Sequence, residues 1–451
     1  MEALLEHATA PGVSGLALFR LMPKFKRNTL QTFVELARRH GDLVCFRGLW
    51  TSFMLIDPAH VEYVLQTNSR NYRKGKNYKE VAASTGNGLF VSEGDVWRRQ
   101  RRLAQPAFHH QRIASFAKIM TDSAEAMLKH WQPLAECGAS VEVDAEMLRL
   151  TLGIVGKALF SRDLSDEADT MSQSFEIIRK HMTDRIMSVV KFPANFPTLQ
   201  NRRFRQAIAN AEQIVYDLIA ERRRGQGNTD DLLSLFMAAR DEETGEGLSD
   251  TELRDQALTI IGAGYETTTQ ALAWTWYLLA KHPEIENRLS AEISDVLGGR
   301  TPTFDDLPHL KYTLMVFQEA MRLYPPIWMM TRAAITSDEI GGYRIPANSE
   351  ILLLPYITHR HPKYWDHPEE FDPEHFLPEK VASRPRFAYL PFGGGPRQCI
   401  GNNFALMEAQ LIIATVAQKY RLRLADGRVI EPEASVTLRP RGSMRMKLHQ
   451  A

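Results

Sequence analysis

Apolar residues recur at helical spacing along most of the chain. The stretch 30–40 shows this periodicity, and several amphipathic stretches follow between 95 and 240. The longest segment opens with Ser249 and Glu252 at the spacing of a capping box and contains no proline before Pro283. Its roughly 32 residues would form a helix of about 48 Å. Because it is apolar on most faces, we expect it to cross the interior of the protein.

Short runs of β-branched and aromatic residues interrupt the helical pattern. We expect a hairpin of 43–46 with 52–56, strands at 341–346 and 350–355, a final hairpin at 436–448, helices at 58–66 and 403–420, and irregular loops at 71–90 and 191–198. The sequence thus predicts a mainly α protein with a smaller β-rich part at approximately 41–60 and 340–356.

Composition is that of an ordinary globular protein. Of the 451 residues, 44% are hydrophobic and 24% are charged, and the formal net charge is +1. This balance excludes disorder and fibres, and it gives no reason to expect nucleic-acid binding. No repeat or linker divides the sequence, so we expect a single domain over 1–451.

The chain contains three scattered cysteines, Cys45, Cys137 and Cys399. They exclude a disulfide framework and a cysteine-rich zinc site, and they indicate a reducing compartment. The sequence has no secretory signal pattern and no run of about 18 consecutive apolar residues. We therefore expect a soluble, cytoplasmic protein with no membrane span.

The segment FGGGPRQCIG at 392–401 places Cys399 between a glycine-rich loop and a following helix. Glycines permit positive φ and let the backbone approach a flat ligand, and a helix N-terminus favours a thiolate. An isolated thiolate of this kind suits axial ligation of a haem iron. From the residues alone, a structural turn with a buried cysteine and a cysteine nucleophile remain open.

Glu319 and Arg322, in the sequence QEAMRLYPP, are spaced to share one face of a helix. The alternative is an ordinary surface ion pair. Apolar neighbours on both sides favour a buried pair, in which the loss of one partner would leave an uncompensated charge.

The sequence AGYETT at 263–268 lies within the long predicted helix. Ala263 and Thr267 are four residues apart, so the threonine hydroxyl can bond the alanine carbonyl and open the helix locally. Glu266 adds a titratable group beside them. Taken alone, the segment would be interpreted as a packing site of small residues.

Trp97 and Arg101 are four residues apart in a basic helical segment. Their indole N–H and guanidinium can reach one anionic group together. The alternative is an exposed basic helix, to which Arg98, Arg99 and Arg102 would belong.

The pattern FxxGxRxCxG at 392–401, continued by Phe404, Ala405 and Glu408, resembles the haem-binding signature of the cytochrome P-450 superfamily. The other three motifs occur in the order typical of that family, and together they span roughly 78–445. The resemblance implies a stand-alone haem domain of soluble bacterial type, a triangular prism with the long helix over the haem and a haem-binding loop at 391–401. It also implies haem b (iron protoporphyrin IX) as cofactor and the insertion of one oxygen atom from O2 into an organic substrate.

The same resemblance implies a role for each motif. Cys399 is the implied axial ligand of the haem iron, and Thr267 and Glu266 are the implied catalytic residues for oxygen activation and proton delivery. The residues implied to contact the haem or its propionates are Trp97, Arg101, Arg332, Arg397, Phe392, Gly393, Ala263 and Gly401.

Glu319 and Arg322 resemble the element that locks the family's fold behind the haem. The usual third member is an arginine in a PERF segment, whereas this chain has PEHF at 373–376 with His375 in that place. This departure leaves the geometry of the network open.

The resemblance also indicates which segments surround the substrate. The residues concerned are Leu89, Phe90, Phe192, Phe196, Trp328 and Met329. Their apolar bulk suits a hydrophobic substrate such as a fatty acid or terpenoid. The alternative is that about half of them are ordinary core residues.

We expect the electrons to come from another protein, because the sequence has no room for a fused flavin reductase and no GxGxxG fingerprint. We expect a ferredoxin or flavodoxin with its NAD(P)H-dependent reductase, and a monomeric chain. The basic residues Arg98, Arg99, Arg102 and Arg397 are candidates for the docking face.

Three other functions remain as alternatives. A haem-thiolate enzyme that uses or rearranges peroxides is one, although such enzymes tend to lose the acid–threonine pair that is intact here as Glu266 and Thr267. A non-enzymatic haem sensor would need no proton relay. A cysteine hydrolase would need a histidine base against Cys399.

Overall fold

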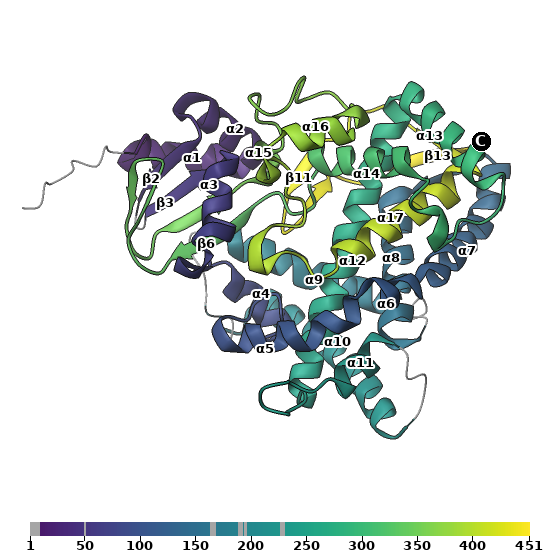
Figure 1. Cartoon of the computed structure of the whole chain (residues 1–451), viewed down its shortest axis with the longest axis horizontal. Coiled ribbons are helices and arrows are strands. Elements are labelled where there is room, and N and C mark those ends of the chain that lie inside the picture. The colour runs from purple at the N-terminus through teal and green to yellow at the C-terminus, as the bar shows by residue number, and fades with distance from the viewer. Residues whose placement is uncertain (1–9, 49–50, 163–167, 188–192, 194–195, 226–230) are drawn as a thin grey trace, which may run out of the picture. The chain divides into compact units, whose positions relative to one another are not determined.

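The computed structural model describes residues 10–48, 51–162, 168–187, 193, 196–225 and 231–451 (Figure 1). The chain divides into two compact units. Unit 1 comprises Met1–Tyr78 and Arg322–Cys399, and unit 2 comprises Lys79–Met321 and Ile400–Ala451. The expectation of a single domain over 1–451 stays a prediction.

Unit 1 is built around a six-stranded sheet with the order β1-β2-β3-β9-β6-β4 (Figure 1). The strands are β1 Gly12–Ser14, β2 Leu43–Arg47, β3 Thr51–Leu55, β4 Tyr72–Lys74, β6 Met330–Ala334 and β9 Glu350–Leu353, with β7 Asp338–Ile340 and β8 Tyr343–Ile345 as a separate hairpin. β2 and β3 pair antiparallel, as predicted for the hairpin near the start of the chain. Leucine, isoleucine, phenylalanine and tyrosine side chains from these strands form much of the core of the unit.

Short helices complete unit 1. They are α1 Gly15–Arg27, α2 Thr29–His40, α3 Pro58–Glu62, α15 Pro355–Thr358 and α16 Pro378–Ser383, with the π-helix η1 Tyr63–Thr67 and the 3-10 helices η2 Ser69–Asn71, η5 Pro373–Phe376, η6 Arg386–Ala388 and η7 Gly395–Arg397. The helices predicted at 30–40 and 58–66 are confirmed.

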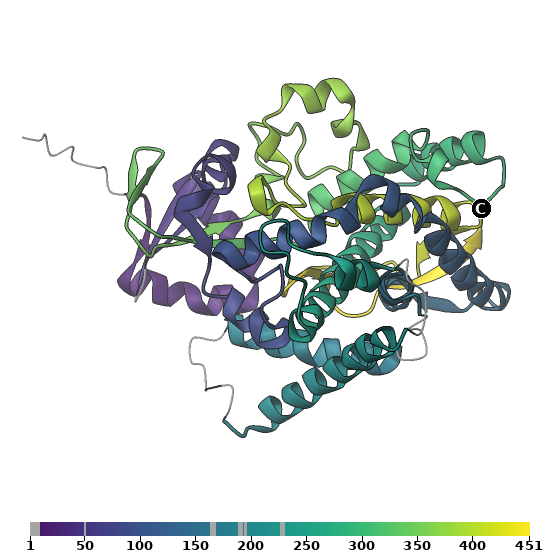
Figure 2. The ribbon, with the colours of Figure 1, turned by 60° about the horizontal axis from the view of Figure 1, so that its bottom comes forward.

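Unit 2 is mostly helical. Its helices are α4 Tyr78–Thr85, α5 Gly94–Ala104, α6 His110–Ala114, α7 Ala117–Glu136, α8 Val143–Phe160, α9 Ala168–Met187, α10 Leu199–Arg223, α11 Leu232–Ala238, α12 Asp250–Lys281, α13 Pro283–Leu297, α14 Lys311–Leu323 and α17 Asn402–Ala417, with the 3-10 helices η3 Gln105–Phe108 and η4 Phe304–Asp306. α4 and α14 begin or end in unit 1. α9 and α10 pack side by side, as Figure 2 shows in blue-green.

The long predicted helix is confirmed as α12. Ser249 and Glu252 form the expected capping box, in which each side chain accepts a hydrogen bond from the other residue's backbone N–H. The helix packs against α8, α10, α11, α13 and α17 (Figure 1). Because neighbours cover most of its faces, α12 is the central helix of unit 2.

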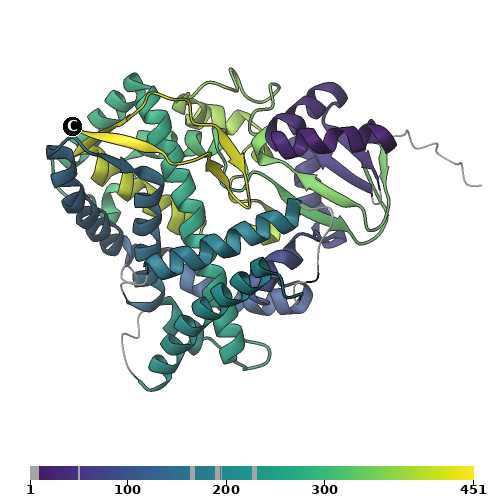
Figure 3. The ribbon, with the colours of Figure 1, turned by 180° about the vertical axis from the view of Figure 1, so that it is seen from behind.

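Two expectations about local structure were wrong. The range 71–90 is not one irregular loop, since it contains β4 and α4. The C-terminal strands β12 Leu438–Pro440 and β13 Arg445–Gln450 do not pair with each other: β12 pairs with β11 Pro432–Ala434, and β13 lies between β10 Tyr420–Leu424 and β5 Ser140–Glu142. Figure 3 shows β10 and β13 side by side in yellow. Spacing along the sequence predicted the strands, but their partners come from distant positions.

In the described part of the chain, no helix is both long and apolar enough to cross a membrane.

Candidate active site

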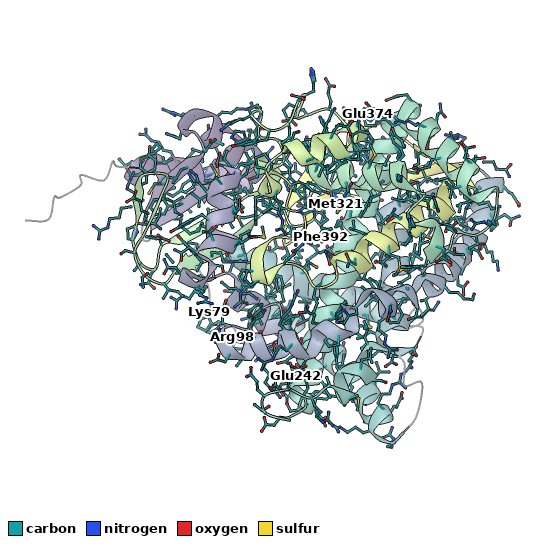
Figure 4. All side chains as sticks on the ribbon, in the orientation of Figure 1. Lys79, Arg98, Glu242, Met321, Glu374 and Phe392 are labelled. Atoms are coloured by element: carbon teal, nitrogen blue, oxygen red, sulfur yellow. The ribbon has the colours of Figure 1, made fainter. Side chains whose placement is uncertain are left out.

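The loop that carries Cys399 in unit 1 is fixed by its backbone. Gly393 and Gly395 have φ of 68° and 65°, in the left-handed region that favours glycine. A Cβ atom at Gly395 would overlap the carbonyl oxygen of Leu65 in η1, so only glycine fits there. The Cys399 N–H donates to the Phe392 carbonyl at 2.9 Å and closes the loop. Figure 4 labels Phe392 at the start of this loop.

This geometry leaves the cysteine side chain accessible. Cys399 is exposed, whereas Cys45, in strand β2, is buried and burial raises the pKa of its thiol. The exposed position disagrees with the alternative of a structural turn around a buried cysteine. Among the described residues, no group of three or more His, Cys, Asp and Glu side chains is arranged to hold a metal ion. A single exposed sulfur on a rigid glycine loop fits axial ligation of a haem iron.

Unit 2 provides a second accessible feature, on a helix that is otherwise covered. α12 is buried along most of its length, but Ala263 is exposed and Thr267 is half-buried. A Cβ atom built on Gly262 would meet no atom within 4 Å. The Thr267 hydroxyl donates to the Ala263 carbonyl at 2.7 Å, as the spacing predicted. The middle of the central helix therefore presents an accessible face of small residues.

Glu266 lies beside this face, but its carboxylate is held on the buried side of the helix. Its Oε1 accepts a hydrogen bond from the Thr437 hydroxyl at 2.7 Å, and Arg439 Nε lies 3.9 Å from the same oxygen. Gln270 Nε2 is 3.5 Å away. The acid predicted from the sequence is therefore anchored by residues of the C-terminal β11–β12 segment.

That anchor continues to helix α9. Arg439 also pairs with Glu176 at 3.1 Å, and Glu176 is bound by Arg179. Burial alone would raise the pKa of Glu176, but the bonds from Arg179 and Arg439 hold it below its ordinary value. Arg179 donates in turn to the Ser435 hydroxyl at 2.8 Å. Sequence reasoning missed this network, because its members are far apart in the chain and carry no spacing signal.

A second buried acid, Glu408 on α17, belongs to the signature found in the sequence. It is 1% exposed, and burial raises its pKa to about 8 against the lowering effect of a hydrogen bond with Thr268. A carboxyl group with this pKa stays protonated at neutral pH. Thr268 follows Thr267 on α12, so the signature helix contacts the buried side of the same helical turn.

The segment that carries Leu89 and Phe90 is tied to the first half of α12. The Leu89 N–H donates to Gln256 Oε1 at 3.2 Å, and the Asn87 N–H donates to Asp255 Oδ2 at 2.7 Å. Leu89 is half-buried and Phe90 is exposed. Asp255 and Gln256 are positioning residues that no motif in the sequence indicated.

The remaining predicted pocket residues differ in their surroundings. Phe192 lies outside the described residues, and Phe196 is exposed. Trp328 is 2% exposed and packs against Phe33, which favours the alternative of a core residue. Met329 is half-buried. The role of all of them toward a substrate stays a prediction.

The residues predicted to contact the haem lie on several elements. Trp97 and Arg101 are both half-buried on α5, at the expected helical spacing. In unit 1, Arg397 ends η7 and is half-buried, and the buried Arg332 donates to the Thr331 carbonyl at 2.9 Å. Gly401, in unit 2, precedes the first residue of α17. Their contacts with haem stay predictions.

The basic residues of α5 are largely offset by acids of unit 2. Arg99 pairs with Glu252 at 2.8 Å, and Arg102 pairs with Asp241 at 2.9 Å and with Glu243. Arg98 pairs with Asp95, and Figure 4 labels Arg98 on α5. These ion pairs argue against the expectation of an open basic docking face at α5, because they neutralise the charges that would attract an acidic partner.

Glu319 and Arg322 both lie on α14 and both are 0% exposed, so the surface-pair alternative is wrong. Within unit 1, Arg322 donates to the carbonyls of His359 at 3.0 Å, Pro368 at 2.6 Å and Glu370 at 2.8 Å. One buried guanidinium thus satisfies three carbonyls of an irregular segment.

His375 belongs to the same region of unit 1. Its Nε2 is 2.8 Å from the Asp366 carbonyl, and its ring meets Trp365 edge-on. The Arg384 guanidinium lies over the Trp365 ring, 3.6 Å from its centroid, and donates to the His375 carbonyl at 2.6 Å. A nearby arginine therefore accompanies the histidine that departs from the family pattern.

Comparisons with known proteins agree with this arrangement. The family model described as cytochrome P-450 matches residues 11–447. The chain is 40% identical to cyclooctatin synthase of Streptomyces melanosporofaciens, over 98% of this chain and 95% of that protein. It is also 40% identical to cyclooctat-9-en-7-ol 5-monooxygenase of the same organism (93% and 90% covered) and 35% identical to pentalenene oxygenase of Streptomyces avermitilis (92% of each).

A solved cytochrome P-450 haem domain matches the structure with a TM-score of 0.85 and 29% identity, over 94% of this chain and 93% of that one. This likeness bears out the predicted mainly α fold. The chain therefore belongs to the cytochrome P-450 family and is a haem-thiolate monooxygenase that acts on hydrophobic substrates.

Proposed function

We propose that this chain hydroxylates a terpenoid skeleton and that Cys399 would hold the iron of haem b. The observation that carries the proposal is the pair of accessible features: an exposed thiol on a rigid glycine loop, and an open small-residue face around Ala263 on a buried helix. The printed names of the relatives support the substrate class, since cyclooctat-9-en-7-ol and pentalenene are terpenoids.

When bound, haem would supply the redox chemistry with dioxygen. Cys399 would hold the haem iron, because its side chain is exposed and its backbone is fixed by the bond to the Phe392 carbonyl. Trp97, Arg101, Arg332 and Arg397 would bind the propionates, because charge-assisted hydrogen bonds to a carboxylate are strong. Phe392, Gly393, Ala263 and Gly401 supply uncharged contact surface.

Thr267 and Glu266 deliver protons. The Thr267 hydroxyl donates its proton to the Ala263 carbonyl, so its oxygen is left to accept a hydrogen bond from a ligand or water on the open face. Glu266 accepts a bond from Thr437. A rotation of the Glu266 side chain away from Thr437 and Arg439 would bring its carboxyl group to the side of Thr267. After Glu266 has given up a proton there, water would supply it with another.

The remaining parts of the proposal concern partners. Electrons come from a ferredoxin or flavodoxin with its NAD(P)H-dependent reductase, and the chain works as a cytoplasmic monomer. Arg397 remains a candidate for docking, whereas the paired arginines of α5 are weaker candidates.

The test is turnover under ¹⁸O2 by the haem-loaded chain, a ferredoxin, its reductase and NADPH, with a panel of cyclic terpenes and fatty acids. We expect one labelled oxygen atom in a terpene product and no product from Cys399→Ala. Turnover that requires hydrogen peroxide and fails with the ferredoxin system would contradict the proposal. The pyridine haemochrome spectrum of the extracted cofactor separately identifies haem b.

A further inference from the structure

Helix α1 of unit 1 has one face fixed to the protein and one open apolar face. It lies alongside β1, β2 and α2, at the purple end of the chain in Figure 3. Leu18, Leu21 and Phe25 are half-buried on the inner side. On the outer side, Leu16 and Phe19 are 76% and 70% exposed. Large apolar side chains this exposed, and this close together, are a candidate interaction site.

The inner contact orients the helix. The Phe25 ring meets the Phe33 ring of α2 edge-on at 4.8 Å. Asn28 caps the start of α2 through a bond from the Gln31 N–H at 3.1 Å. α1 is therefore joined to the unit by aromatic packing and a capped turn, and its outer face is held in a defined direction.

Basic residues flank the exposed apolar stripe. At 100° per residue, Leu16, Phe19 and Pro23 fall within one narrow sector of the helix. Lys26 borders this sector on one side, and Arg20 and Arg27 border it on the other; all three are exposed. No acidic residue occurs in the sequence between Glu6 and Glu35. The outer face thus combines an apolar centre with a wholly basic rim.

We propose that the outer face of α1 docks this protein onto an anionic phospholipid surface. A helix with an apolar stripe between basic residues lies in the plane of the membrane interface, with its apolar side chains among the acyl chains and its bases on the headgroup phosphates. The basic rim selects this partner over a second copy of the chain. Two α1 helices packed face to face would place like charges against each other.

The experiment is sedimentation of the haem-loaded full chain with vesicles of phosphatidylglycerol and phosphatidylcholine, compared with vesicles of phosphatidylcholine alone. We expect binding to the anionic vesicles that weakens as salt is raised. Leu16→Ser with Phe19→Ser should weaken binding at least about tenfold, because two apolar side chains lose their burial. Arg20→Gln with Lys26→Gln and Arg27→Gln should weaken it on the order of 100-fold and remove the salt dependence.

Matched controls separate this face from general surface properties. Arg112→Gln with Lys118→Gln and Lys129→Gln removes the same charge from exposed positions of unit 2 and should leave binding unchanged. Val381→Ser with Val429→Ser removes two other exposed apolar side chains and should also leave it unchanged. An unchanged thiolate spectrum would confirm that each variant is folded.

Two results would overturn the proposal. One is equal sedimentation with neutral and anionic vesicles, or binding that the α1 variants do not alter. The other is self-association in velocity sedimentation that the Leu16 and Phe19 substitutions abolish, since this would assign the face to a second copy of the chain. Neither result depends on catalytic activity.

Discussion

The cysteine loop and the glutamate network are held in place in different ways. The loop at 392–401 is held by its own backbone, through positive φ at Gly395 and a hydrogen bond from Cys399 to Phe392. Glu266 is held by side chains of Thr437 and Arg439, which lie far from it in the sequence. A loop held by its backbone requires particular residue types at fixed positions, so it can be recognised in the sequence. A network of side chains from distant positions produces no such pattern in the sequence.

The largest expected effect comes from a substitution that disrupts the backbone of the cysteine loop. Gly395→Ala should lower the free energy of unfolding by about 5 kcal/mol, because strain at positive φ adds to overlap with the Leu65 carbonyl. Gly442→Ala is the matched control: Gly442 has φ of 79°, but a Cβ atom there meets nothing within 4 Å. It should cost about 1 kcal/mol. Denaturant unfolding measures both, and equal losses would show that backbone overlap does not hold the loop.

A second prediction concerns Glu408. The sequence signature includes this residue, but its raised pKa follows from its burial in the folded protein. Its folded pKa of about 8 exceeds the ordinary value of 4.5, so the folded state keeps a proton that the unfolded state loses. The stabilising effect of this proton is complete below pH 4.5 and is lost as pH rises toward 8. Glu408→Gln removes this dependence. Relative to the wild-type chain, the variant should gain about 3 kcal/mol between pH 4.5 and pH 7.

Thermal and denaturant unfolding of both proteins across that range measures the difference. A difference between variant and wild-type chain that stays constant with pH would mean that Glu408 ionises normally in the folded protein.

A third prediction compares two threonines with the same helical hydrogen bond. Thr267 and Thr275 each donate to the carbonyl four residues earlier at 2.7 Å, but Thr275 is fully buried. Thr267→Val should lower the rate of product formation about 100-fold while NADPH consumption continues, since the loss of a hydroxyl that positions the proton-delivering water has an effect on this scale. Thr275→Val should leave the ratio of product to NADPH unchanged. An equal ratio of product formed to NADPH consumed in both variants would show that Thr267 has no part in proton delivery.

The features that the sequence predicted correctly depend on residues close together in the chain, and the features that it missed depend on residues far apart. α12, its capping box and the cysteine loop were predicted, because each depends on residues close together in the chain. The pairing of the C-terminal strands was wrong, because β13 binds β10 and β5 across long separations. The Glu176–Arg439 link and the ion pairs of the α5 arginines were also missed, since charged residues carry no signal of their partner.

The smallest expected effect comes from a substitution in the side-chain network that holds Glu266. Thr437→Val removes the hydroxyl that donates to Glu266 Oε1 and should lower the rate of product formation about tenfold, because the buried carboxylate loses a partner and its resting position. Thr437→Ser retains the hydroxyl and should restore most of the rate. The kinetic solvent isotope effect should rise in the valine variant only. No change in that effect would assign Thr437 a purely structural role.

The most direct test of the central claim is the carbon-monoxide difference spectrum of the reduced, haem-loaded chain. We predict a Soret band characteristic of thiolate ligation in the wild-type chain and in Cys137→Ala, and its complete absence in Cys399→Ala. A thiolate band that survives in Cys399→Ala, or a wild-type chain that binds no haem, would contradict the assignment of Cys399 as the axial ligand.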